Sequence, residues 1–393
     1  MTFKNRRKYM RKSRFAMRAA QQGMTLVELM VAVTLSLLIS VALLTLFVNV
    51  SRSNNELAKT NLQIENGRFA MQFLQADLSH AGYWGTYLPK FDNLAFTGIP
   101  NDVPTAVPDP CKSFATWTAQ DKLNLVGISV QTYDAVPVTC TGLITSVQAN
   151  TDILVVRHAE TCSPGDTNCE ALDTTKTYFQ SSLDADCAGA ASYPTFVLDN
   201  AAASFTLKTR NCTTVAPLRK FISNIYYVRN YAVTAGDGIP TLMRSEFDVS
   251  SGVPTQLAAV PLVDGIEGFR VELGIDSLSR SGAAINYANA VVWTDATLES
   301  NPTNRGDGQV DGDYVRCTTA VPCTAAQLMN TVAVKVFMLA RAREATSDYT
   351  DTKTYAMGST SSGPTLTPGG SFKRHAFSTT VRLVNTSGRR ETP

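Results

Sequence analysis

The sequence predicts an α+β fold in which one long N-terminal helix packs against an antiparallel β-sheet with disulfide-stapled loops. Three observations support this prediction. An apolar run fills residues 24–50, a helical repeat of apolar residues continues from it to residue 81, and later segments are rich in β-branched and aromatic residues. The 393-residue chain is 44% hydrophobic and 17% charged, which is ordinary for a protein with a sizeable core.

Residues 24–50 form the predicted membrane-spanning half of the helix. Glu28 is the only ionisable residue between Met24 and Val48. A helix of this length extends about 40 Å at ~1.5 Å per residue, which is enough to cross a hydrocarbon core of about 30 Å. A carboxylate this close to lipid needs a partner, because an unpaired one costs on the order of a few kcal/mol.

Residues 1–23 form a basic leader. It contains eight lysines and arginines and no acidic residue, which predicts that this end stays in the cytoplasm and that the rest is exported. Without these eight charges the formal net charge falls from +2 to −6, so the exported part is mildly acidic. That charge argues against a surface for nucleic acid. A secretory signal would have a shorter apolar core with a cleavage site after it. The simpler alternative is a plain uncleaved anchor.

Residues 51–82 form the predicted second half of the helix. Leu57, Ile64, Met71 and Leu78 recur every seven residues and keep one face apolar. A coiled coil shows the same repeat. The chain has no second long helical pattern, however, so we expect this half to lie on the protein's own sheet.

Residues 83–393 form the predicted β-rich domain. Its strands show the alternation of apolar and polar residues that is typical of half-buried antiparallel strands. The predicted strands are residues 151–159, 204–208, 220–230, 262–276, 331–341 and 375–385.

Eight cysteines follow residue 110, in the part of the chain that the predicted topology places in an oxidising compartment. We therefore interpret them as disulfides. Spacing alone leaves many pairings open. A nearest-neighbour scheme would join Cys111 to Cys140, Cys162 to Cys169, Cys187 to Cys212 and Cys317 to Cys323. Zinc is the alternative, but the sequence has no Cys-x-x-Cys motif and no suitably spaced histidine. We predict no metal and no cofactor.

Three further groups of residues could carry chemistry. Asp307, Asp311 and Asp313 lie among glycines, but they fail the EF-hand pattern and predict a solvated turn rather than a calcium site. No nucleophile elbow, phosphate loop or HExxH helix surrounds a histidine, so we predict no enzyme activity. The histidines are His80, His158 and His375. A basic group near the C-terminus is interpreted as a solvated strand edge rather than a DNA contact. It comprises Lys373, Arg374, Arg382, Arg389 and Arg390.

The start of the apolar run resembles the class III signal of type IV prepilins and of type II secretion pseudopilins. The resemblance rests on the basic leader, Gly23 and the following Met-Thr-Leu-Val-Glu. It implies that a prepilin peptidase cuts after Gly23, that the new N-terminal Met24 is N-methylated, and that Glu28 becomes the fifth residue of the mature chain. The Met24 amine would then lie near the depth of Glu28, and a neighbouring subunit could pair one group with the other.

Later segments resemble the PilW family of minor pilins. They are residues 66–85, which end in AGYWG, and the strands VDGIEGFRVELGID, VAVKVFMLARAR and HAFSTTVRLVN, in that order. The resemblance implies a type IV pilin-like fold and a minor pilin that helps to initiate or prime pilus assembly. The implied partners are other minor pilins, the major pilin and prepilin peptidase, with a tip adhesin as a further candidate.

The resemblance also implies an inner-membrane protein with a cytoplasmic N-terminus, a single span and a periplasmic C-terminal domain that can enter the pilus. Two alternatives remain open, a minor pseudopilin of a type II secretion system and an anchored periplasmic enzyme. The gene neighbourhood would separate the pilus from the secretion assembly. An uncut N-terminus would favour the enzyme.

Overall fold

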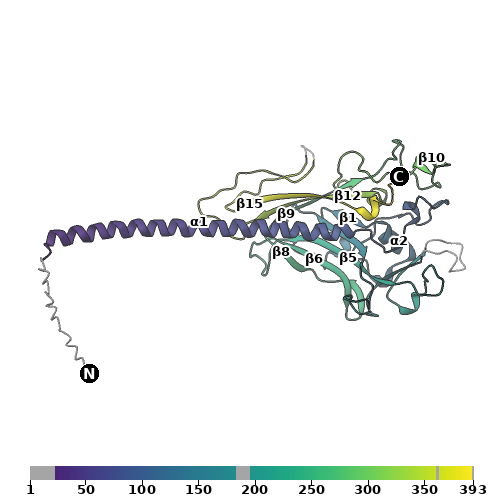
Figure 1. The fold of residues 1–393 in the computed structure, drawn as a ribbon, viewed down its shortest axis with the longest axis horizontal. Coiled ribbons are helices and arrows are strands. Elements are labelled where there is room, and N and C mark those ends of the chain that lie inside the picture. The colour runs from purple at the N-terminus through teal and green to yellow at the C-terminus, as the bar shows by residue number, and fades with distance from the viewer. Residues whose placement is uncertain (1–22, 183–194, 360–362, 392–393) are drawn as a thin grey trace, which may run out of the picture. The chain divides into compact units, whose positions relative to one another are not determined.

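A computed structural model describes residues 23–182, 195–359 and 363–391 of the chain. The chain divides into two compact units, one up to Leu57 and one from Ala58 onward. One long helix, α1 (Leu26–His80), contributes its first half to one unit and its remaining turns to the other (Figure 1). The prediction of one continuous helix over residues 24–81 is confirmed to within two residues at each end.

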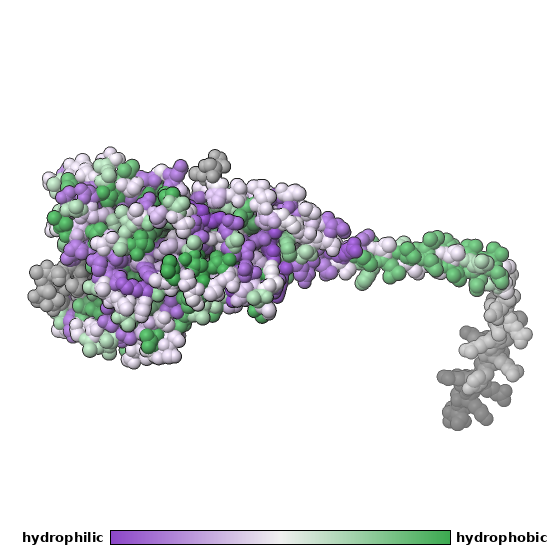
Figure 2. Space-filling model, turned by 180° about the vertical axis from the view of Figure 1, so that it is seen from behind, coloured by the Kyte–Doolittle hydropathy of each residue, from purple (hydrophilic) through white to green (hydrophobic). Residues whose placement is uncertain are grey.

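The first half of α1 is apolar on every side. It is long and apolar enough to cross a membrane, and none of its most apolar stretch is buried. Figure 2 shows apolar residues along this half of the helix, whereas polar and apolar residues mix over the folded unit. A helix that is hydrophobic all round needs an apolar surrounding, such as a bilayer or a bundle of other helices.

The second unit contains fifteen strands and three short helices among the residues that the structure describes. The strands are β1 (Val130–Tyr133), β2 (Ile153–Ala159), β3 (Tyr178–Ser182), β4 (Thr195–Asp199), β5 (Leu218–Arg229), β6 (Thr241–Ser250), β7 (Val253–Gln256), β8 (Val260–Asp264), β9 (Ile266–Ile275), β10 (Trp293–Asp295), β11 (Ser300–Pro302), β12 (Thr331–Arg341), β13 (Tyr355–Ala356), β14 (Thr365–Leu366) and β15 (Arg374–Arg382). The helices are α2 (Ala119–Gly127), α3 (Ala325–Met329) and α4 (Val384–Ser387).

Two antiparallel sheets carry most of this unit. The larger has eight strands in the order β1-β2-β5-β3-β4, with β6 also beside β5 and with β7 and β8 paired to β6. The smaller has the order β15-β12-β9, and β15 pairs with β12 along the whole length of β15 without a register shift. Two small hairpins, β10-β11 and β13-β14, complete the strands.

The main core joins the end of α1 to both sheets. Ala70, Leu74 and Leu78 of α1 are fully buried against residues of β1, β2, β5, β9 and β12. Leu57 is 59% exposed, so the seven-residue repeat is buried only in its later part. Gly67 marks where helix and sheet come closest, because a Cβ atom there would lie 2.2 Å from the Phe377 ring.

The predicted strand at residues 262–276 is two strands. Gly265 separates β8 from β9 with a φ of +80°, and an added Cβ there would lie 2.8 Å from the carbonyl oxygen of Arg341. Only glycine adopts this conformation without strain. The corner sends β8 to the larger sheet and β9 to the smaller one, so this glycine connects the two sheets.

Other strand predictions had mixed outcomes. The prediction for residues 331–341 matches β12 in both bounds, but the expectation of a half-buried strand is wrong because β12 is central and buried on both faces. The strand predicted at residues 204–208 is wrong. A 3-10 turn (Ala202–Ser204) occupies its start, and Lys208 forms an isolated bridge with Val215. The long strand β6 was missed, because charged residues interrupt its apolar pattern.

Candidate processing and assembly site

The predicted cleavage site lies in an exposed segment just before α1. Gly23, Met24 and Thr25 are exposed, and α1 begins at Leu26. An added Cβ at Gly23 would meet no atom within 4 Å, and its φ is not in the left-handed region. Nothing in the described part of the fold therefore requires glycine here. The basic leader before it lies outside the described residues.

Glu28 caps the start of α1. Its Oε2 accepts hydrogen bonds from the N–H and the hydroxyl of Thr25, both at 3.0 Å, and the Thr25 hydroxyl accepts from the Glu28 N–H at 3.3 Å. This reciprocal pattern is a capping box. Thr-x-x-Glu before an apolar run is its sequence signature, so Thr25 is a local partner of Glu28 that the sequence alone could have predicted.

The hydroxyl side chains inside the apolar half of α1 form hydrogen bonds within the helix. The hydroxyls of Thr34, Ser36, Ser40 and Thr45 donate to backbone carbonyls three or four residues earlier, at 2.7 to 3.0 Å. Such back-bonding removes the cost of placing a hydroxyl in hydrocarbon. Glu28 is then the one ionisable side chain between Met24 and Val48.

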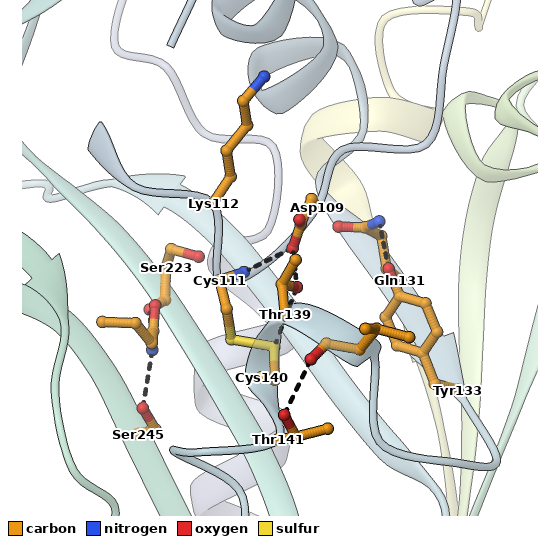
Figure 3. Close-up of a disulfide and its surroundings, with 12 residues drawn as sticks. Asp109, Cys111, Lys112, Gln131, Tyr133, Thr139, Cys140, Thr141, Ser223 and Ser245 are labelled. Atoms are coloured by element: carbon orange, nitrogen blue, oxygen red, sulfur yellow. Dashed lines mark hydrogen bonds between the residues drawn. A yellow bond between two sulfur atoms is a disulfide. The ribbon is translucent and has the colours of Figure 1, made fainter. Parts of the chain in front are cut away.

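Three of the four predicted disulfides are formed between described residues. They join Cys111 to Cys140, Cys162 to Cys169 and Cys317 to Cys323. Figure 3 shows the first of them, where the Asp109 carboxylate accepts hydrogen bonds from the Cys111 N–H at 3.0 Å and the Thr139 hydroxyl at 2.5 Å. Cys187 lies outside the described residues, so its pairing with Cys212 stays a prediction.

The three aspartates of the suspected calcium loop do not converge. Asp311 accepts hydrogen bonds from the backbone N–H groups of Ser277 and Leu278, at 2.8 and 2.7 Å. Asp307 accepts from the N–H of Gln309, at 3.0 Å. Over the described ranges no group of three or more metal-binding side chains is found. These carboxylates stabilise turns.

In the basic group at the C-terminus Arg374 and Arg390 are buried, Lys373 and Arg389 are half-buried, and Arg382 is exposed, so the interpretation of the group as a solvated strand edge is wrong. The Arg374 guanidinium donates to Asp351 at 2.8 Å and to Glu267. The Arg390 guanidinium donates to Asp92 at 2.9 Å and to Asp276 at 3.2 Å. The sequence shows that these residues are charged, but it does not show their partners, which lie far away along the chain.

Arg390 sits at the centre of the most buried of these networks. Its side chain is 2% exposed, and those of Asp92 and Asp276 are 3% and 0% exposed. Burial raises the pKa of Asp276 to about 6, although Arg390 and the Gly308 N–H both act to lower it. Burial alone would lower the pKa of Arg390, but the nearby carboxylates raise it well above its usual range. This network ties the end of the chain to the distant segments at Asp92 and Asp276, and the sequence did not predict it.

A second buried polar group connects α1 to the larger sheet. The Asp77 carboxylate of α1 accepts hydrogen bonds from His158 Nε2 at 2.9 Å, Tyr226 OH at 2.8 Å and Asn224 Nδ2 at 3.1 Å. Burial acts to lower the pKa of His158, but the hydrogen bond and charge of Asp77 outweigh it, and the pKa is raised. His158 Nδ1 lies 2.9 Å from the carbonyl oxygen of Ala159, so both ring nitrogens face acceptors, as in a protonated imidazole.

The remaining histidines show no catalytic arrangement. His80 Nδ1 lies 2.8 Å from the carbonyl oxygen of Ala76, within α1, and its ring is 5.7 Å from that of His158. His375 is exposed on β15, beside Phe377.

Comparison with known proteins adds two matches at different places in the chain. Residues 225–385 match the family of the type IV pilus-assembly protein W, and residues 18–44 match the prokaryotic N-terminal methylation motif. Among solved structures, the chain is similar to a type IV-like pilin from Thermus thermophilus, with 14% identity, a TM-score of 0.23, and coverage of 61% of this chain and 80% of that one. No curated protein matches the chain.

The methylation motif overlaps the exposed apolar helix, and the second match covers strands of both sheets from β5 to β15. Together they define a type IV pilin-like protein. Within that class, the match over residues 225–385 supports a minor pilin of the PilW family. The family indicates a structural role rather than an enzymatic one.

Proposed function

We propose that this pilin takes part in initiating type IV pilus assembly at the inner membrane. The observation that carries the proposal is the fully exposed apolar half of α1, which directly follows the exposed Gly23 and contains a single carboxylate. Such a helix is suited to two apolar surroundings in succession, first the bilayer and then a bundle of pilin helices. The family matched by residues 225–385 is one of pilus assembly, which favours the pilus over type II secretion.

Processing and orientation follow from the leader. Prepilin peptidase cuts after Gly23, Met24 is N-methylated, and the chain crosses the inner membrane once with its C-terminal domain in the periplasm. The eight positive charges of residues 1–23 and the exposure of Gly23 support this arrangement. In this proposal the leader keeps the N-terminus in the cytoplasm until the cut, and the mature chain can then enter the pilus.

Glu28 has a second role in assembly. The Thr25 hydrogen bonds both reach its Oε2, and a carboxylate has about four acceptor sites. Glu28 can therefore cap its own helix and still accept the Met24 amine of a neighbouring pilin. In a low-dielectric bundle such a pair favours one axial offset between subunits. The partners in this proposal are other minor pilins, the major pilin and a tip adhesin.

The test is to delete the gene in a strain that cannot retract its pili and to count surface pili. Loss of a priming component should lower pilus number strongly while leaving the level of major pilin in the membrane unchanged. Unchanged pilus number would overturn the priming role. Impaired protein secretion with normal piliation would identify a pseudopilin instead.

Two substitutions separate processing from assembly. Gly23→Leu should leave the leader attached, which mass spectrometry of the membrane protein would show. Glu28→Ala should leave cleavage and the disulfides intact but reduce co-purification with partner pilins and pilus number. Glu28→Gln is the matched control, because it keeps hydrogen bonds to Thr25 while removing the charge. If Glu28→Gln assembles as the parent does, pairing with the amine is not required.

A further inference from the structure

A cavity of about 270 Å³ lies beside the Cys317–Cys323 disulfide of the folded unit. Its walls come from the end of β1, from the disulfide loop and from α3, and they are mainly apolar. Val107, Pro322 and Leu328 are among the residues that line it. An apolar cavity of about 150 Å³ is large enough to bind benzene. This one therefore has room for a six-membered ring with a substituent.

Thr132 of β1 places a buried hydroxyl at this wall. The residue is 4% exposed, and its hydroxyl has no hydrogen-bond partner among the described residues. Side chains alternate along a strand, so Thr132 lies on the same face of β1 as Val130. Val130 packs in the main core with Cys317 and Leu328, which also line the cavity. The Thr132 side chain is therefore on the cavity side of β1, and burying its hydroxyl without a partner costs free energy.

The other side-chain hydroxyls of the described wall already have partners. The hydroxyl of Tyr133 accepts a hydrogen bond from a glutamine side chain at 3.0 Å, and that of Thr318 accepts one from a backbone N–H of the disulfide loop, also at 3.0 Å. The Thr319 hydroxyl donates to the Asp134 carboxylate at 3.4 Å. Among the hydroxyls that line the cavity, the Thr132 group is thus the one left for a ligand.

The charges around the cavity favour a neutral ligand. Asp134 is the one acidic or basic side chain in the described lining, and its carboxylate repels an anion. This carboxylate already accepts a hydrogen bond from the Thr319 N–H at 2.8 Å, and a cation would lose its hydration against the apolar walls. The nearby Arg316 does not line the cavity, and its guanidinium binds Asp152, with Nη2 at 2.6 Å from the carboxylate.

We propose that this cavity binds a small neutral molecule consisting of one aromatic ring with a hydroxyl group, of about the size of phenol. The ring packs against the apolar walls at Val107 and Leu328, and its hydroxyl bonds to that of Thr132. A rigid ring suits the site better than a flexible alcohol of the same volume, because it loses less conformational freedom on binding. The proposal does not depend on the assembly role above.

The test measures binding of 4-fluorophenol to the full chain in detergent by fluorine NMR. Micelles also take up phenols, so every variant is compared with the parent at the same detergent concentration. Ala135 is exposed and lines the cavity, so Ala135→Trp should block it and define the background from the micelles. The parent should broaden the fluorine signal above that background in a saturable way. A thermal melt checks that each variant folds, and empty micelles supply the background if Ala135→Trp does not.

Thr132→Val tests the hydroxyl, because valine keeps the shape of the side chain. It should weaken 4-fluorophenol binding by about two- to tenfold, the value of one neutral hydrogen bond, whereas fluorobenzene should bind the variant and the parent alike. Thr132→Ser keeps the hydroxyl and should keep the preference for 4-fluorophenol. Without ligand, Thr132→Val should melt at a higher temperature than the parent, because the fold no longer buries an unpaired hydroxyl.

The charge of the ligand is tested with 4-fluorobenzoate, which should bind the parent at least about tenfold more weakly than 4-fluorophenol does. A parent signal equal to the background at millimolar 4-fluorophenol would overturn the proposal. Equal 4-fluorophenol binding by Thr132→Val, or a lower melting temperature of that variant without ligand, would overturn the role of the hydroxyl. Tighter binding of 4-fluorobenzoate would overturn the neutral class.

Discussion

Replacing Arg390 by alanine should be among the most damaging single changes in the folded domain. The substitution leaves Asp92 and Asp276 buried at 3% and 0% exposure without the cation that they share. Breaking a buried ion pair on one side costs about 3 to 5 kcal/mol, because the remaining charge loses its compensation. For a unit of this size 1 kcal/mol corresponds to roughly 1.4 °C, so the melting temperature should fall by about 4 to 7 °C.

Arg382→Ala is the matched control for this measurement. It removes an arginine of the same C-terminal region from an ion pair with Glu391, but the two side chains are 53% and 52% exposed. Exposed pairs contribute at most about 1 kcal/mol. Differential scanning calorimetry of the detergent-solubilised chain would compare the two variants with the parent. An Arg390→Ala loss no larger than that of Arg382→Ala would refute the reasoning.

The pH dependence of the Arg390→Ala loss tests its cause. The pKa of Asp276 is about 6 in the folded parent against an ordinary value of 3.8, so its burial lowers stability progressively as the pH rises from about 4 to 6. Removing Arg390 raises this folded pKa further, which extends the loss to higher pH. The deficit of Arg390→Ala should therefore be smaller at pH 5 than at pH 7.5. An equal deficit at both would point to lost packing instead.

Three further predictions concern other parts of the same domain. The raised pKa of His158 stabilises the folded chain below about pH 6.5, and this contribution is lost as the pH rises through the folded pKa. In urea titrations the free energy of unfolding of the parent should therefore exceed that of His158→Gln by more at pH 6 than at pH 9. Replacing both cysteines of the Cys111–Cys140 disulfide by serine should cost about 1 kcal/mol more than the same change at Cys317–Cys323, since the closed loops have sequence separations of 29 and 6; equal melting losses would contradict the loop-length argument. Gly67→Ala should lower stability by about 1 to 3 kcal/mol because of the Phe377 ring, and Phe377→Leu in the same chain should recover part of the loss; no recovery would show that the ring is not the obstacle.

The sequence predicted the helices and strands whose residue pattern repeats over their whole length and whose surroundings stay the same along it. The apolar run and its helical repeat gave α1 to within two residues, and the alternation at residues 331–341 gave both ends of β12. A pattern does not show where a chain changes sheets. Gly265 looked like part of one strand, although its positive φ separates β8 from β9.

The candidate site was predictable only where its signals are local in sequence. The close cysteine pairs fall into that class, and so does the Thr25 cap on Glu28, whereas the processing role of Gly23 and the assembly role of Glu28 stay predictions. Arg374 and Arg390 illustrate the other case. Their carboxylate partners lie between 23 and 298 residues away. The sequence therefore shows two ordinary basic residues, although both are buried and bonded to carboxylates in the fold.

The contacts at the end of the chain also set when this domain can fold. Asn385 and Arg389 bond to carbonyl oxygens at the end of α1, more than 300 residues earlier, and Arg390 fixes the loop at Asp92. Such distant pairings form slowly, because much of the chain must be ordered first. A growing chain therefore cannot make these contacts until residues 385–390 are available. Completion of these residues and closure of the core at the end of α1 become a single event, and a chain truncated before Asn385 would expose the apolar face of α1 to quality-control proteases.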